Sequence, residues 1–130
     1  MREIKFRAWD KNKKEIREVT SINWYDEYIW VDESPMSGDK LPIELTPLMQ
    51  DTGLKDKNGV DIYEGDIVTC EFAFGDNVCE IVYDDDKAGF FVSQKNREIA
   101  DKAYDNLYWH FEGIEVIGNI YENPELLDNN

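Results

Sequence analysis

The chain has 130 residues, enough for one domain or for one domain with a small appendage. Its formal net charge is −15, and such a surface repels nucleic acid phosphates and anionic lipids, which argues against general binding of duplexes or membranes. Four Trp, seven Tyr and six Phe predict a folded core, because disordered chains are poor in aromatics. The excess of acids either keeps the protein soluble or attracts a basic partner.

The charge is unevenly distributed along the chain. Residues 1–20 contain seven Lys or Arg and four acids, a net +3, so the remainder carries −18. We expect this basic segment to lie against an acidic surface, either of its own chain or of a neighbouring subunit. No apolar stretch after Met1 reads as a secretory signal, and no run reaches the length of a membrane span. A cytoplasmic protein with reduced thiols is therefore predicted.

The N-terminal residues predict a β-hairpin. Residues 3–9 alternate between charged and apolar, the period of a half-buried strand. The polar run 10–15 is typical of a turn, and 16–22 can form the return strand, although Ile16 and Val19 break its alternation. After a loop over 32–40, two prolines exclude a regular helix, so an extended stretch or short strand is expected there.

Residues 24–31 predict a further strand that is unusually rich in aromatics. Trp24, Tyr28 and Trp30 share one parity, and Tyr25 has the other. If both faces of this strand are apolar, it is either sandwiched in the core or lies at an interface. These four aromatics form the candidate interface.

The sharpest local motif is the turn at Asn58-Gly59. This pair is preferred in two-residue type I′ hairpin turns, because both central positions need a positive φ. Gly65-Asp66 is expected to form a second turn before a strand over 67–74.

Short strands and turns continue to the end of the chain. We expect a turn at 75–77, a strand over 78–83, a turn at 84–89 and a strand from Phe90. For the rest of the chain we expect a helix-like stretch at 96–106, strands at 107–111 and 114–121, and a helical turn at 124–127. This pattern predicts an all-β (mainly β) barrel or sandwich.

No residue pattern predicts catalysis or metal binding. The single histidine, His110, lies among aromatics in a strand-like run. Cys70 and Cys79 lack zinc-knuckle spacing, and burial is the favoured interpretation over redox or metal use. The aspartates at 84–86 lack the spacing of a calcium loop, which favours a solvated turn. We assign no catalytic, cofactor-binding or metal-binding residue, and we expect that the protein is not an enzyme.

Three segments resemble the YopX family: MREIKFRAWD at the start, MQDTGLKDKNGVDIYEGDIV over 49–68, and EVIGNIYENPELL over 115–127. The resemblance implies a phage or prophage origin, a bacterial host cell and a C-terminal small barrel of the Src-homology-3-like type. It implies no established activity. We therefore expect an N-terminal β-rich extension with a hairpin over 1–50 and the barrel domain over 51–130. Within it, residues 66–121 should form the barrel, with a core of Val68, Ile81, Val92, Val116 and Ile120.

Two functions are consistent with these features. The first is a protein-interaction module that binds a host or phage protein without catalysis. The second is a nucleic-acid-associated accessory factor that uses the small barrel and the basic N-terminal segment, against which the net charge argues. We also expect the protein to self-associate through its N-terminal half. The alternative is a monomer in which the N-terminal half folds back on the barrel of the same chain.

Overall fold

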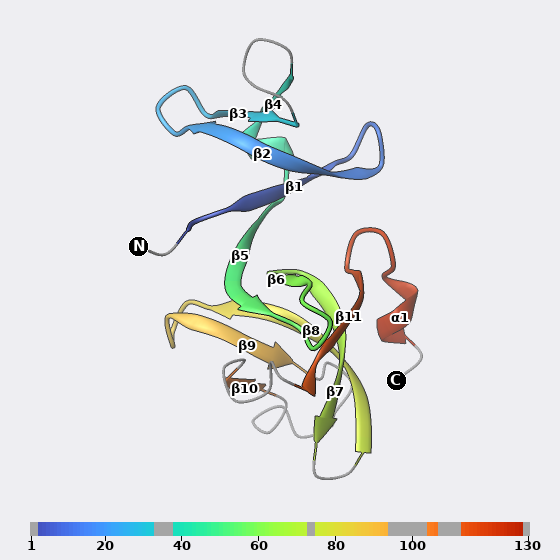
Figure 1. The fold of residues 1–130 in the computed structure, drawn as a ribbon. Helices are drawn as coiled ribbons and strands as arrows, with labels where there is room; N and C mark the ends of the chain where they lie inside the picture. Colours follow the sequence, from blue (N-terminus) through green and yellow to red (C-terminus); the bar gives the residue numbers. More distant parts are fainter. Residues whose placement is uncertain (1–2, 33–37, 73–74, 94–103, 107–112, 129–130) are drawn as a thin grey trace. The chain divides into compact units, whose positions relative to one another are not determined.

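The computed structural model describes residues 3–32, 38–72, 75–93, 104–106 and 113–128 (Figure 1). Strands supply almost all of its regular structure, and they form two antiparallel sheets. The prediction of an all-β protein is therefore confirmed. The chain divides into two compact units, residues 1–51 and 52–130.

The first unit is built on consecutive antiparallel strands. Its elements are β1 (Phe6–Asp10), β2 (Glu15–Asn23), β3 (Tyr28–Val31), β4 (Asp39–Pro42), the 3-10 turn η1 (Ile43–Leu45) and the start of β5 (Leu48–Lys55). The strand order is β4-β3-β2-β1-β5, and β6 of the second unit follows β5 in the same order. Ala8, Ile29 and Val31 are fully buried at the centre of this sheet. Partly buried Val19, Ile22, Leu41, Ile43 and Leu48 pack against them.

A bulge in β2 explains why the alternation of residues 16–22 is broken. Val19 lies opposite Val31, whereas Ser21 lies opposite Trp30, so Thr20 has no partner position on β3. Because a bulge adds one residue to a strand, it reverses the alternation beyond it. Val19 and Ile22 have opposite parities in the sequence, and both pack against the same core because of this bulge.

The strand that we expected over 24–31 begins only at Tyr28. Residues 24–27 instead form the turn between β2 and β3, with a positive φ of 59° at Glu27. Asn23 is the physical reason. Its Oδ1 accepts the backbone N–H of Asp26 at 2.9 Å, and its Nδ2 donates to the Asp26 carboxylate at 3.2 Å. Such a side-chain turn outweighs the β-propensity of the aromatics.

The second unit carries the other sheet. Its elements are β6 (Asp61–Tyr63), β7 (Asp66–Phe72), β8 (Gly75–Asp84), β9 (Gly89–Ser93), β10 (Tyr104–Asn106), β11 (Glu115–Asn119) and the helix α1 (Glu125–Asp128). The order of the second sheet is β10-β9-β8-β7-β11. In the described part of the chain no strand pair joins β10 to β11, so the sheet is open there and the expected barrel closure is not observed.

The core of the second unit contains most of the residues predicted for it. Val68, Ile81 and Val92 are fully buried, and Val116 packs against their cluster. Ile120 is half-buried. Cys79, for which burial was the favoured interpretation, completes the cluster together with Ile62 and Ile114, which were not predicted for it.

Some predicted boundaries in this unit are wrong. Gly75 and Asn77 are paired residues of β8, so the turn expected at 75–77 is wrong. Residues 104–106 belong to a strand and not to the helix expected at 96–106. The remainder of that stretch and the strand expected at 107–111 lie outside the described residues. The turn at 84–89 and the helical turn near 124–127 are confirmed.

The turn at Asn58-Gly59 is confirmed in position but not in type. Only Gly59 of the pair has a positive φ, 82°, which excludes type I′. The N–H of Gly59 donates to the carbonyl of Asp56 at 3.0 Å, and the N–H of Asp56 donates to the carbonyl of Val60 at 2.8 Å. This is a three-residue loop closed by a left-handed glycine. The Asp56 carboxylate selects it by accepting the N–H groups of Asn58 and Val60.

Replacing Gly59 with valine should therefore lower the free energy of unfolding by about 1–2 kcal/mol. No atom lies within 4 Å of the Cβ that the new side chain would add, so the cost is backbone strain and not crowding. Gly59→Asn is the matched control, because asparagine tolerates this conformation and should cost less. Denaturant midpoints of the two variants measure the difference. Equal midpoints for Gly59→Val and the parent protein would contradict the left-handed turn.

Candidate functional site

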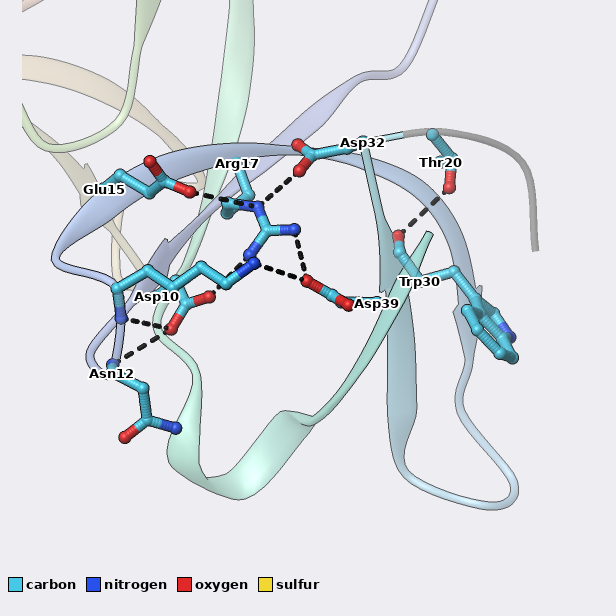
Figure 2. Close-up of polar contacts among 9 residues, drawn as sticks. Asp10, Asn12, Glu15, Arg17, Thr20, Trp30, Asp32 and Asp39 are labelled. Atoms are coloured by element: carbon cyan, nitrogen blue, oxygen red, sulfur yellow. Dashed lines mark hydrogen bonds and ion pairs between the residues drawn. The ribbon is translucent and has the colours of Figure 1, made fainter. Parts of the chain in front are cut away.

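Four strands of the first unit meet at the guanidinium of Arg17, which is 5% exposed (Figure 2). Nη1 donates to Asp10 at 2.7 Å, Nε to Asp32 at 2.5 Å, and Nη2 to Asp39 at 2.7 Å. Figure 2 shows the three carboxylates pointing toward it. Asp10 comes from β1, Arg17 from β2, Asp39 from β4, and Asp32 directly follows β3. We call these four residues the Arg17 cluster, and it ties the ends of these strands together.

Two carboxylates of the Arg17 cluster, those of Asp10 and Asp39, are held in the charged form. Burial raises the pKa of Asp10, but the backbone N–H groups of Lys13 and Asn12 and the guanidinium of Arg17 outweigh it, so the pKa lies below its usual value. Hydrogen bonds from Arg17 and Lys13 also lower the pKa of Asp39. Asp10 and Asp39 therefore stay ionised at neutral pH.

These pKa values predict that the first unit is sensitive to acid. The pKa of Asp10 and Asp39 is lower in the folded protein than the ordinary 3.8 of the unfolded chain. Their stabilising contribution is therefore complete above that value, and it is lost as the pH falls through the folded pKa. We expect the denaturant midpoint of unfolding to be lower at about pH 3 than at about pH 6. Tryptophan fluorescence measures the unfolding at each pH. Asp10→Asn should reduce this pH dependence, and an unchanged dependence would contradict the assignment.

The opposite face of the same strands carries aromatic side chains. On β3, Ile29 and Val31 point into the core, whereas Tyr28 and Trp30 lie half-buried on the other face. Their rings meet edge to face, with centroids 6.1 Å apart. In Figure 2 the indole of Trp30 points away from the Arg17 cluster. The Nζ of Lys40, on β4, lies 4.0 Å from the centre of the Tyr28 ring.

The turn over residues 24–27, which we call the tip, adds two exposed aromatic side chains directly before β3. Trp24 is 65% exposed and Tyr25 is 95% exposed. Asp26 and Glu27 follow, both exposed. An open, shallow pocket of about 450 Å³ lies between the tip and β4, lined by Asp26, Glu27, Tyr28, Lys40, Leu41 and Pro42. Asn23 holds the tip, and its Nδ2 also lies 3.3 Å from the hydroxyl of Tyr28. The N–H of Ile43 holds it as well, by donating to the backbone carbonyl of Glu27 at 3.0 Å.

The structure separates the four predicted interface residues into two pairs. Trp24 and Tyr25 lie on the exposed tip, and Tyr28 and Trp30 lie half-buried on the strand behind it. Lys40, Asp26 and Glu27 were not predicted to belong to this surface. The acids directly follow the aromatics and could have been noticed, but Lys40 meets Tyr28 only through strand pairing, which places it opposite Trp30.

The residues considered for metal or redox chemistry are Cys70, Cys79, His110 and the aspartates at 84–86. Cys79 is a buried thiol opposite Val68, and Cys70 pairs with Asn77 along the same hairpin. His110 lies outside the described residues. Asp84 organises its turn by accepting the N–H groups of Asp86 and Lys87. In the described ranges no three His, Cys, Asp or Glu are placed to hold a metal ion. Helices of the described chain are all too short or too polar to cross a bilayer.

The fold and this surface define a small antiparallel β protein with two units and an exposed aromatic tip on the first. The chain belongs to the YopX family, since the family model described as "YopX protein" matches residues 5–128. Among solved structures, it is similar to protein EF1440 from Enterococcus faecalis, with 35% identity and a TM-score of 0.65. That match covers 98% of this chain and 99% of the other. A search of curated proteins finds no match.

Proposed function

We propose that this protein is a non-enzymatic interaction module, encoded by a phage or prophage, that binds another protein through its tip and aromatic face. The observation that carries this proposal is the exposure of Trp24 and Tyr25, at 65% and 95%, on a turn fixed by side-chain hydrogen bonds. We place its action in the cytoplasm of the bacterial host, where fractionation of infected or lysogenic cells can test it.

Two physical arguments support this surface as a binding site. Tryptophan and tyrosine dominate the binding energy of protein interfaces, because each buries a large area at little cost in side-chain entropy. The tip is also pre-organised by Asn23, so little conformational freedom is lost when a partner binds. The core of the first unit does not use these two side chains, so they remain available to a partner.

Affinity capture from the bacterial host tests the proposal. The parent protein is compared with the double variant Trp24→Ala/Tyr25→Ala, and bound proteins are identified by mass spectrometry. The matched control is Tyr83→Ala, which removes a 43% exposed aromatic from the second unit. We expect one specific protein that the control retains and the double variant loses. Identical captures with all three proteins would refute the tip as the binding site.

We also expect no binding to duplex DNA at physiological salt. The basic residues of the N-terminal segment are partly neutralised by the chain itself: Arg17 by its three carboxylates, Lys13 by Asp39, and Lys5 by Asp51. The remaining basic residues would have to overcome a net charge of −15 before any phosphate contact helps. A gel-shift assay at low and at physiological salt measures this. A salt-sensitive complex at physiological salt would favour the nucleic-acid-associated function instead.

A further inference from the structure

The tip combines the two chemical groups that recognise organic cations in proteins. Trp24 and Tyr25 present exposed aromatic rings, and the next two residues, Asp26 and Glu27, are exposed carboxylates. An aromatic face attracts a cation through its quadrupole, and a neighbouring carboxylate attracts it through its charge. Neither group alone would specify a ligand, but here they follow one another on a turn whose conformation is fixed by Asn23.

The chain contains its own example of such a contact beside the tip. The ammonium group of Lys40 lies 4.0 Å from the centre of the Tyr28 ring, within the range of a cation–π interaction. Both residues line the shallow pocket that also includes Asp26 and Glu27. In this pocket the alkylammonium group of Lys40 therefore already lies against the ring of Tyr28, and two carboxylate residues belong to the same lining.

We propose that the tip and this pocket bind the cationic side chains of a lysine- or arginine-rich segment of a partner protein. This inference rests on the proposed function and names the chemistry of its partner. Long-range charge selects among the possible occupants. A basic segment is attracted by a net charge of −15, whereas a second copy of the chain, carrying the same charge, is repelled.

Calorimetric titration with a defined peptide tests the proposal. The probe is a short synthetic peptide of alternating arginine and serine, and its control replaces each arginine with citrulline, a neutral side chain of nearly the same shape. We expect the arginine peptide to bind and the citrulline peptide not to bind. Tyr25→Ala should weaken binding about fivefold. Asp26→Asn/Glu27→Gln should weaken it about tenfold.

Matched charge changes elsewhere separate a local site from general attraction. Asp85→Asn/Asp86→Asn removes two exposed acids from a turn of the second unit, and should leave the affinity within about twofold. Lys40→Gln frees the Tyr28 ring and removes a competing cation, so it should strengthen binding about threefold. Lys11→Gln makes the same charge change in the exposed turn at the opposite end of β2 and should have a smaller effect.

Each alternative result overturns the inference. Equal losses in the tip variant and in the Asp85/Asp86 variant would show that any acidic surface suffices. Failure of the arginine peptide to bind, while the Trp24→Ala/Tyr25→Ala variant still loses its captured partner, would leave the interaction surface standing without cationic chemistry. A dimer mass in light scattering that disappears in the tip variants would identify a second copy as the occupant instead.

Discussion

Replacing Arg17 with methionine should destabilise the first unit by about 3 kcal/mol or more. The change leaves Asp10, 4% exposed, as a buried carboxylate without its cationic partner. Asp32 and Asp39 are 44% and 49% exposed, so they can turn to water and should add little to the loss. Three of the four tryptophans, Trp9, Trp24 and Trp30, lie in residues 1–51, so the denaturant transition in tryptophan fluorescence reports mainly on this unit.

Two further variants separate the buried charge from the other ion pairs. Lys13→Met removes an exposed partner of Asp39, 3.0 Å away, and should change stability by less than about 0.5 kcal/mol. Adding Asp10→Asn to Arg17→Met removes the stranded charge and should recover part of the loss. An Arg17→Met protein as stable as its parent would show that the Arg17 cluster contributes nothing to the fold.

Replacing Asp56 with alanine should cost the second unit about 3 kcal/mol. Asp56 is buried, and its carboxylate accepts three backbone N–H groups, those of Asn58 at 2.8 Å, Val60 at 2.9 Å and Val116 at 2.9 Å. The last bond joins the hairpin loop to β11, which lies 60 positions further along the chain. Without the carboxylate, all three donors lose their acceptor.

Two further variants separate the contribution of the loop hydrogen bonds from that of the bond to Val116. Asp56→Asn keeps one acceptor oxygen for the loop but cannot accept the N–H of Val116, so it should cost about half as much as alanine. Asp84→Ala is the matched control, because Asp84 accepts the N–H groups of Asp86 and Lys87, both in its own exposed turn. It should cost about 1 kcal/mol or less. Thermal unfolding followed by circular dichroism ranks the variants, and equal losses at Asp56 and Asp84 would contradict the role of the distant bond.

The strands of this fold are predictable from the sequence, whereas several of its turns are not. Alternation of apolar and polar residues located β1, and the expected strands at 16–22 and 114–121 correspond to β2 and β11. Even the disturbed alternation at Val19 corresponds to a bulge. The predictions were wrong at residues 24–27 and in the type of turn at Gly59. In both cases the side chain of one residue, Asn23 or Asp56, accepts backbone N–H groups and decides the conformation. Propensity scales for strands do not contain such bonds.

The candidate site was predictable only in its aromatic members. Their density within residues 24–30 indicated a special surface, but only the strand register shows which rings are covered. The Arg17 cluster was not predictable, because its acids lie at positions 10, 32 and 39 and meet only after three strand pairs have formed. Among 29 acidic residues, nothing in the sequence distinguishes these three.

The bulge at Thr20 has a consequence for how this protein can change in length. Deleting Thr20 would leave a regular ladder in which Val19, Ser21 and Ile22 keep their present faces, because the bulge holds one surplus residue. The cost would include the contact of the Thr20 hydroxyl with the carbonyl of Trp30, at 3.2 Å. A bulge also bends its strand and increases the twist, so its removal would turn the end of β2 that leads into the tip with Trp24 and Tyr25. A one-residue deletion here would thus re-aim the tip while leaving every one of its side chains unchanged.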